Sequence, residues 1–237
     1  MTASSGKQRV LGAHGVPLTV HVPAGEVRGG IVVVQEIYGV DEHIVAVTES
    51  LAAQGYLAVA PHLYHRVTDA PVRTYREARP LVRGLTGKSI RHDVDDALDA
   101  LDSAGVGANR IGVLGYSMGG TVALWAASTM PVAAAVSLYG AGLGRSRWPG
   151  VPAGLESAAA LRAPWLGLFG DRDASIPVEQ AEALQAVLAS VAAPAAVVRY
   201  PHAGHGFASG PGSRHYRAGD AADAWARATS WFDTYLG

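Results

Sequence analysis

Short runs of apolar, β-branched residues alternate along the chain with longer segments in which apolar residues recur every three or four positions. The short runs predict β-strands, and residues 30–35 (GIVVVQ) have the continuous apolar pattern that is typical of a strand buried on both faces. Residues 17–22 alternate between outward and inward side chains, which predicts a half-exposed strand at the edge of a sheet. Further strands are predicted at residues 57–60, 110–114, 133–138, 165–169 and 196–200.

The longer segments have the spacing of amphipathic helices. Apolar residues at 90, 94, 97, 98 and 101 fall on one helical face, and helices are also predicted at 41–55, 178–191 and 225–235. Residues 119–127 predict a helix of small residues. Strands that alternate with helices need crossover connections, which predicts an α/β fold with a mostly parallel central sheet and helices on both faces. Residues 141–158 are rich in Gly and Pro and predict a long loop, either functional or a plain surface connection.

The composition excludes a disordered chain, because 49% of the 237 residues are hydrophobic and the formal net charge is only −1. An α/β chain of this length is expected to form one domain over residues 1–237. The chain has no cysteine, which excludes disulfides, thiolate zinc sites and a cysteine nucleophile.

Charge and hydropathy also bear on partners and location. Nineteen Lys and Arg residues against 20 Asp and Glu give no excess of positive charge, so no nucleic-acid partner is predicted. No apolar run approaches the roughly 18 residues needed to span a membrane. Residues 1–12 are polar and lack the apolar stretch of a secretory signal, so a cytoplasmic protein is expected.

The strongest motif is Gly-Tyr-Ser-Met-Gly at residues 115–119, a G-x-S-x-G between a predicted strand and a predicted helix. In this setting the serine occupies a sharp turn and its hydroxyl projects above the sheet. The glycines are needed because side chains there would collide with the neighbouring strand and helix. Ser117 is therefore the predicted nucleophile, and the N–H of Met118, at the helix start, is a predicted donor to the substrate oxygen.

A serine nucleophile needs a base, and the base needs an acid that orients it. Three histidines follow the serine along the chain: His202, His205 and His215. His205 lies between glycines in a loop directly after the last predicted strand, where the backbone can aim the imidazole back at the top of the sheet. His205 is therefore the predicted base, with His202 as the alternative.

Two carboxylates compete for the role of the acid, both in the loop after the penultimate predicted strand. Asp171 could pair with Arg172 or shape the turn. Asp173 lies at the far end of the loop, shortly before an Ile-Pro step into the next helix. This position favours Asp173.

The loop after the buried strand at 30–35 carries the sequence Gln-Glu-Ile-Tyr-Gly at residues 35–39. A second oxyanion donor usually comes from such a loop, and the N–H of Ile37 is the candidate. Glu36 lies at the end of a buried strand, where an unpaired charge is costly. We therefore expect Glu36 either to act at the site or to pair with an arginine.

Five segments of the chain together resemble the dienelactone hydrolase family of α/β-hydrolases, in the family's order and at suitable spacing. They are residues 35–39, 60–64 (APHLY), 115–120 (GYSMGG), 170–177 (GDRDASIP) and 203–207 (AGHGF). The resemblance implies an α/β-hydrolase fold and a triad carried by Ser117, Asp173 and His205. It also implies backbone oxyanion donors at Ile37 and Met118 and a site-facing Glu36. Tyr38 and Tyr64, which lie in the first two segments, are candidate substrate contacts.

The chain departs from the family pattern at several positions. Ser117 stands where the type enzymes have a cysteine that the early glutamate contacts, and His62 stands where an aspartate is usual. The type enzymes clamp the substrate carboxylate with arginines, one of them shortly after the catalytic histidine. Here no arginine lies between Phe207 and Arg214. This difference predicts a neutral ester or lactone as substrate. The alternative is that arginines elsewhere in the chain, such as Arg79, Arg83 or Arg145, fold over the pocket and supply the missing charge.

Other patterns are interpreted as structural. Residues 84–89 resemble the end of a phosphate-binding loop but lack its first glycine and a preceding strand, so they predict a turn and a helix start. Trp148 could line a hydrophobic pocket or belong to the core or surface. The histidine pairs at 62 and 65 and at 202 and 205 lack a third ligand, so no metal site is predicted. Five aspartates are expected to form the solvated face of the helix at 90–101: Asp93, Asp95, Asp96, Asp99 and Asp102.

The sequence thus predicts a hydrolase of carboxylic esters or lactones that forms an acyl-enzyme and needs no cofactor. We expect a monomer or a small homo-oligomer. The alternatives are a thioester or amide hydrolase with the same triad, and a binding protein that keeps the fold without turnover.

Overall fold

An eight-stranded sheet forms the centre of the computed structural model, which describes residues 6–68 and 70–236. The strand order is β1-β2-β4-β3-β5-β6-β7-β8. Strands β1 and β2, and β2 and β4, pair antiparallel, and all later neighbours pair parallel. The predicted α/β-hydrolase fold with a mostly parallel sheet is therefore confirmed. The strands are β1 (Gly6–Leu11), β2 (Pro17–Val22), β3 (Gly29–Val34), β4 (Tyr56–Pro61), β5 (Ile111–Tyr116), β6 (Ala134–Leu138), β7 (Trp165–Gly170) and β8 (Ala195–Tyr200).

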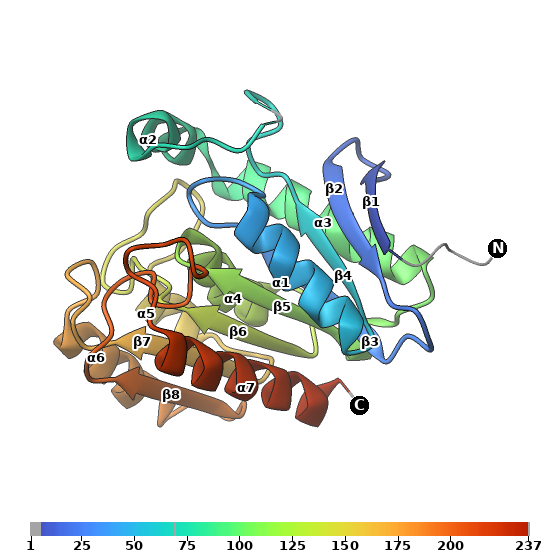
Figure 1. Ribbon diagram of the computed structural model, residues 1–237. Coiled ribbons are helices and arrows are strands. Elements are labelled where there is room, and N and C mark those ends of the chain that lie inside the picture. Colours follow the sequence, from blue (N-terminus) through green and yellow to red (C-terminus); the bar gives the residue numbers. More distant parts are fainter. Residues whose placement is uncertain (1–5, 69, 237) are drawn as a thin grey trace.

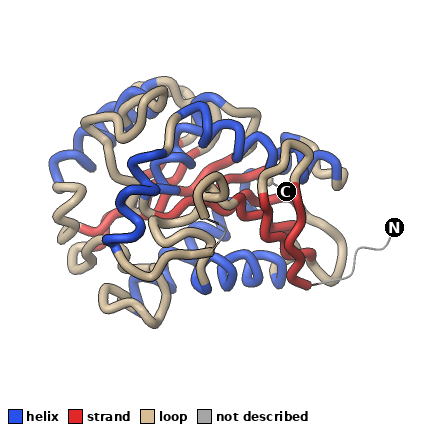
Figure 2. Tube along the Cα trace, turned by 90° about the horizontal axis from the view of Figure 1, so that it is seen from above, coloured by secondary structure: helices blue, strands red, loops and turns tan. Residues whose placement is uncertain are grey.

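Helices cover both faces of the sheet (Figures 1 and 2). In Figure 1, α1 and α7 lie in front of the strands, and α3 and α4 lie behind them. Within the described residues, no helix combines the length and the apolar character needed to cross a membrane. The helices are α1 (Glu42–Ala53), α2 (Tyr75–Gly84), α3 (Gly87–Ser103), α4 (Met118–Thr129), α5 (Gly154–Ala159), α6 (Val178–Leu188) and α7 (Ala218–Tyr235), with a short 3₁₀ helix at Ala108–Arg110.

The elements that carry the predicted nucleophile, β5 and α4, are deeply buried. Every residue of β3 and β5 is buried, which agrees with the continuous apolar pattern at residues 30–35. Helix α4 is buried from its first residue through Ser128, and its small residues let it approach the sheet closely. A Cβ added at Gly120 would lie only 2.9 Å from the Cα of Gly140. The turn between β5 and α4 is therefore fixed by close packing on both sides.

The prediction of an edge strand at residues 17–22 was wrong in its position. Strand β1 pairs with β2 along its full length, so β2 is an interior strand and β1 is the edge. The side chains of β1 are almost all exposed, so this strand carries no apolar signal. Helices α2 and α5 were not predicted either, and α5 falls in the segment that we expected to be a loop.

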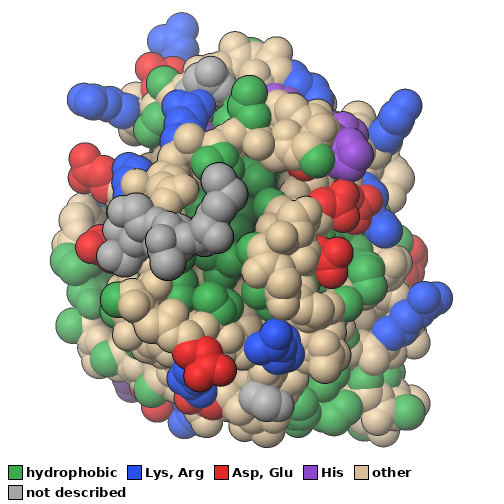
Figure 3. All heavy atoms as spheres, turned by 90° about the vertical axis from the view of Figure 1, so that its right-hand side faces the viewer, with side chains coloured by type: hydrophobic (Ala, Val, Ile, Leu, Met, Phe, Trp, Pro, Cys, Tyr) green, Lys and Arg blue, Asp and Glu red, His purple; other side chains and the backbone are tan. Residues whose placement is uncertain are grey.

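Charged side chains of both signs are interspersed over the face of the molecule shown in Figure 3. This agrees with the formal net charge of −1.

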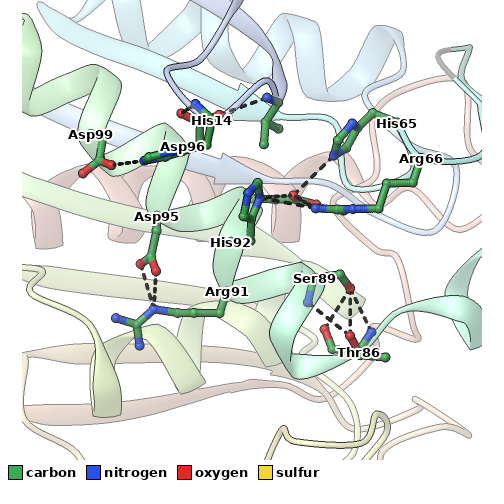
Figure 4. Close-up of polar contacts among 12 residues, drawn as sticks. His14, His65, Arg66, Thr86, Ser89, Arg91, His92, Asp95, Asp96 and Asp99 are labelled. Carbon is green, nitrogen blue, oxygen red and sulfur yellow. Dashed lines mark hydrogen bonds and ion pairs between the residues drawn. The ribbon is translucent and has the colours of Figure 1, made fainter.

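The expectation that five aspartates form the solvated face of the 90–101 helix was wrong for Asp93 and Asp96, both of which are 0% exposed. Asp93 accepts hydrogen bonds from the Arg66 guanidinium at 2.7 and 2.9 Å. Asp96 accepts the backbone N–H groups of His14 and Val16 at 3.0 and 2.9 Å (Figure 4). These partners come from distant parts of the chain, so the local pattern along the helix does not reveal them.

The start of this helix is as predicted. Thr86 caps α3, and its side chain accepts the N–H of Ser89, whose hydroxyl in turn accepts the N–H of Thr86. The glycine-rich segment at 84–89 is thus a helix start, which confirms the structural interpretation of that motif.

Candidate active site

Ser117 lies at the turn between β5 and α4 with backbone angles φ 51° and ψ −112°, a conformation that residues with a side chain rarely adopt. The neighbouring glycines allow this turn. A Cβ at Gly115 would lie 2.0 Å from the carbonyl oxygen of Gly119, and a Cβ at Gly119 would lie 2.2 Å from that of Val34. The turn therefore passes between its neighbours only with glycine at these positions, and it holds Ser117 at the carboxyl end of β5.

Three side chains form one hydrogen-bonded line at this edge of the sheet. Ser117 Oγ lies 2.8 Å from His205 Nε2, and His205 Nδ1 lies 2.7 Å from Asp173 Oδ2. Asp173 is 3% exposed, and its other oxygen accepts the N–H of Ser175 at 2.7 Å. The residues follow β5, β7 and β8, whose carboxyl ends meet because the strands are parallel. The structure thus brings a hydroxyl, an imidazole and a carboxylate together in this order.

The competing residues take other partners. Asp171 Oδ1 lies 2.7 Å from Nε of Arg199, instead of pairing with Arg172. The His202 ring lies 3.3 Å from the Arg172 guanidinium, and the His215 ring contacts the neighbouring arginine side chain at 3.1 Å. Within the described residues, none of these alternatives hydrogen-bonds to the line that ends at the serine.

The two predicted oxyanion donors belong to neighbouring segments. The N–H of Met118 is the first of α4 and has no helical carbonyl one turn earlier. The hydroxyl of Tyr64 donates to the carbonyl oxygen of Ile37 at 3.0 Å and lies 3.2 Å from Sδ of Met118. Burial raises the pKa of Tyr64, so its hydroxyl stays protonated as a donor. Tyr64 therefore contacts the backbone of one predicted donor residue, Ile37, and the side chain of the other, Met118.

A cavity of about 740 Å³ opens over Ser117 and His205. Of the three candidate substrate contacts, Tyr38 lines this cavity, whereas Tyr64 and Trp148 do not. Trp148 is 2% exposed and donates from Nε1 to a carbonyl oxygen at the end of α2 at 2.8 Å, so it joins the long loop to that helix. The remaining lining residues come from the loop after β3, the start of α1 and the loop after β8: Glu36, Ile37, Asp41, Glu42, His43, Ala46, Gly206, Ser209, Gly210, Pro211, Gly212, Ser213, Arg214 and His215.

Glu36 takes neither an arginine nor the serine as its hydrogen-bond partner. It is 7% exposed, and its Oε1 accepts hydrogen bonds from the hydroxyls of Tyr139 at 2.8 Å and Ser209 at 2.9 Å. The Tyr139 ring packs edge-on against the His205 ring, with centroids 5.2 Å apart. Burial and the nearby Glu36 charge raise the pKa of Tyr139, so its hydroxyl remains a donor.

Sequence reasoning missed Tyr139, Ser209 and His43. Tyr139 has a positive φ of 41° and directly follows β6, at the carboxyl edge where site residues gather, which is the one signal that could have identified it. His43 lines the cavity, and its Nε2 is buried without a hydrogen-bond partner among the residues that the structure describes. Burial lowers the pKa of His43, which favours the neutral ring.

The histidine pairs with zinc-like spacing serve other contacts. His62 Nε2 lies 2.9 Å from the Thr19 hydroxyl, and His65 Nε2 lies 3.3 Å from Asp93. His205 belongs to the line described above. Over residues 6–68 and 70–236, no three His, Asp or Glu side chains are grouped so that they could hold a metal ion.

Comparison with known proteins gives consistent matches over nearly the whole chain. The model of the dienelactone hydrolase family matches residues 18–236. A protein of Salmonella typhimurium named "Putative carboxymethylenebutenolidase" is 36% identical over 214 residues, which cover 87% of this chain and 77% of that protein. A carboxymethylenebutenolidase of Rhodococcus opacus is 32% identical over 217 residues, covering 87% and 81%. The crystal structure titled "Putative Dienelactone Hydrolase" from Klebsiella pneumoniae superposes with a TM-score of 0.88 at 31% identity, over 97% of this chain and 98% of that one.

Proposed function

The chain belongs to the dienelactone hydrolase family and is a hydrolase of that type, and we propose that it cleaves carboxylic esters or lactones with Ser117 as the nucleophile. The observation that carries this proposal is the hydrogen-bonded line from Asp173 through His205 to Ser117 at a cavity of about 740 Å³. The Ser-His-Asp triad of acyl-transfer enzymes has these three groups in this order. Residues 1–237 form one catalytic domain in this proposal.

In the proposed reaction, Ser117 Oγ attacks the substrate carbonyl carbon while His205 Nε2 takes the hydroxyl proton. Asp173 accepts the Nδ1–H of His205 and so fixes the tautomer that leaves Nε2 free to act as base. The carbonyl π electrons move to oxygen, where the N–H groups of Ile37 and Met118 stabilise the negative charge. The carbon–oxygen bond to the alcohol then breaks, and His205 gives its proton to the leaving oxygen. Water attacks the acyl-enzyme with the same base and releases the acid.

The charges around the cavity favour a neutral substrate. Three carboxyl side chains line it, those of Glu36, Asp41 and Glu42, against one guanidinium, that of Arg214. Arg214 lies 3.1 Å from the ring of His215, so part of its hydrogen-bonding capacity is used within the protein. A substrate carboxylate here would lose hydration beside like charges, with little compensation.

Hydrolysis of p-nitrophenyl acetate by the wild type and by Ser117→Ala tests the proposed nucleophile. We expect kcat to fall about 10⁴–10⁶-fold in the variant, because the members of a triad act as a unit. A protein that binds esters without turnover would show no hydrolysis in either form. Equal rates on an acyl thioester or an anilide would favour the alternative, a thioester or amide hydrolase with the same triad.

A matched pair of lactones, with and without a carboxylate, tests the preferred substrate charge. We expect the neutral lactone to have the higher kcat/KM. A tenfold preference for the acidic lactone (about 1.4 kcal/mol) that fades as salt rises would instead show that Arg214 or another cation clamps the substrate.

A further inference from the structure

Six arginines are concentrated in two short segments of a chain whose formal net charge is −1. They are Arg73, Arg76, Arg79, Arg83, Arg145 and Arg147, and all six are exposed. Residues 73–83 and 145–147 contain one acid, Glu77. We call these six residues the arginine face. The small net charge of the chain does not reveal it.

The two segments lie side by side in the fold. Trp148 Nε1 donates to the carbonyl oxygen of Val82 at 2.8 Å, which joins the loop after β6 to the end of α2. The N–H of Gly87 donates to the carbonyl oxygen of Pro149 at 2.7 Å and anchors the same loop at the start of α3. Helix α2 stands apart from the sheet at the upper left of Figure 1. Its arginines, Arg76, Arg79 and Arg83, are exposed.

Two hollows are formed on the arginine face, and Arg83 lines both of them. One hollow, of about 660 Å³, is also lined by Arg76 and Arg79. The other, of about 560 Å³, is also lined by Arg145 and Arg147. Among the described residues, neither hollow shares a lining residue with the cavity over Ser117.

The six arginines lack carboxylate partners among the described residues. Glu77, the one acid within the two segments, is already used, because its carboxylate accepts the N–H groups of Arg73 and Thr74 at the start of α2, both at 3.0 Å. Six arginines in other parts of the chain do form ion pairs with aspartates: Arg28 with Asp233, Arg66 with Asp93, Arg91 with Asp95, Arg199 with Asp171, Arg217 with Asp220 and Arg227 with Asp223. Within the described residues, therefore, no ion pair with a carboxylate compensates the positive charge gathered on the arginine face.

The second hollow adds hydrogen-bond donors and a fixed cation. Ser175 and Gln180 line it together with the arginines and supply a hydroxyl and a side-chain amide. The Arg147 guanidinium lies 5.6 Å from the centre of the Trp148 ring, a cation–π contact that restricts its movement. Part of the Arg147 side chain is exposed, but the protein around its guanidinium partly desolvates that group and lowers its pKa, so an anion there would replace lost solvation.

We propose that the arginine face binds a small molecule that carries phosphate groups, at a site separate from the catalytic cavity. Guanidinium groups donate two parallel hydrogen bonds to phosphate oxygens, and two hollows joined by Arg83 can accept two linked phosphates. A nucleic-acid strand would instead need a continuous groove with successive aromatic rings for its bases. Among the residues that line the two hollows, Tyr75 is the one exposed aromatic ring, with 64% of its surface accessible.

Calorimetric titration of the full chain with pyrophosphate at low salt tests this proposal. We expect saturable binding that weakens as salt rises. Arg83→Gln should weaken it at least tenfold, about 1.4 kcal/mol, because this side chain lines both hollows. Arg162→Gln is the matched control: it removes the same charge from an exposed arginine outside the arginine face, and it should leave binding unchanged.

Three results would overturn the proposal. They are no saturable binding in the millimolar range, an equal loss in the two variants, or tighter binding of a short single-stranded oligonucleotide that depends on Arg83. Hydrolysis of p-nitrophenyl acetate is measured in the same samples and should be unchanged in Arg83→Gln. A failure of the phosphate site is therefore distinguishable from a failure of the proposed hydrolase.

Discussion

Asp173 and Asp93 are both buried and both contact histidine, but they lie in regions of different character. Asp173 is 3% exposed and lies 2.7 Å from His205 Nδ1. Asp93 is 0% exposed, and the rings of His65 and His92 lie 3.3 and 3.2 Å from its Oδ1. A buried Asp–His contact is therefore common to both regions and does not by itself identify a catalytic pair.

The regions differ first in what balances the carboxylate charge. Asp93 receives two hydrogen bonds from the Arg66 guanidinium, which is permanently charged (Figure 4). Within the described chain, Asp173 has no arginine or lysine at ion-pair distance, and its second oxygen takes the backbone N–H of Ser175. The charge of Asp173 is thus available to stabilise an imidazolium that forms during a reaction, whereas the charge of Asp93 is already balanced.

The two regions differ also in what the second nitrogen of the imidazole contacts. The second nitrogen of His205 meets the Ser117 hydroxyl at the open cavity. The His65 and His92 rings both turn toward the same Asp93 oxygen, beside α3. In the proposed function, only the Asp173–His205 pair is catalytic, because its ring joins the carboxylate to a hydroxyl that a substrate can approach.

Among the variants that test this comparison, Asp173→Asn is expected to have the largest effect. The variant keeps the shape of the side chain but favours the wrong imidazole tautomer, so kcat on p-nitrophenyl acetate should fall about 10⁴-fold. Asp171→Asn removes a carboxylate from the same loop, where it pairs with Arg199, and should cost far less. The opposite ranking of the two variants would show that the wrong carboxylate has been chosen.

Asp93→Asn should affect stability and leave catalysis intact. The substitution removes the charge that Arg66 binds, and we expect the free energy of unfolding to fall by about 1–3 kcal/mol. The lower part of this range is favoured because the Arg66 side chain is 41% exposed and water can solvate it. Thermal unfolding gives the stability change, and kcat per folded molecule should equal that of the wild type. A large loss of kcat in the folded variant would remove the distinction between the two regions.

The smallest expected effect concerns Glu36, a second buried carboxylate on the catalytic side. Tyr139→Phe removes one of its two hydroxyl donors but keeps the ring against His205. We expect kcat/KM to fall by less than tenfold (about 1.4 kcal/mol), with Ser209→Ala, which removes the other donor, having a similar effect. Unchanged activity in both variants, with reduced stability, would make the Glu36 network structural.

The sequence predicted the residues of the line because each lies in a short segment with its own local signal. Ser117 needs glycines on either side of a tight turn, and His205 follows a strand in a glycine-rich loop. Most strands and helices were predicted for the same reason, since their apolar spacing is local. Strand β1 was missed because an exposed edge strand needs no apolar pattern.

The missed features depend on contacts between distant parts of the chain. The Glu36 carboxylate accepts hydrogen bonds from Tyr139 and Ser209, which lie 103 and 173 residues further along the chain. Asp96 is buried because a turn 80 residues earlier supplies its donors. The arginine face was hidden because two separate segments had to be brought together. No local pattern contains this information.

Labelling with a fluorophosphonate, read out by intact mass and peptide mapping, is the most direct test of the central claim. This reagent reacts with a serine whose hydroxyl is activated by a neighbouring base. We predict one adduct per chain, on Ser117, at equal rates in the wild type and in Asp93→Asn and at a much lower rate in Asp173→Asn. An adduct on another serine, or equal labelling rates in the two aspartate variants, would contradict the claim that the Asp173–His205–Ser117 line is the catalytic one.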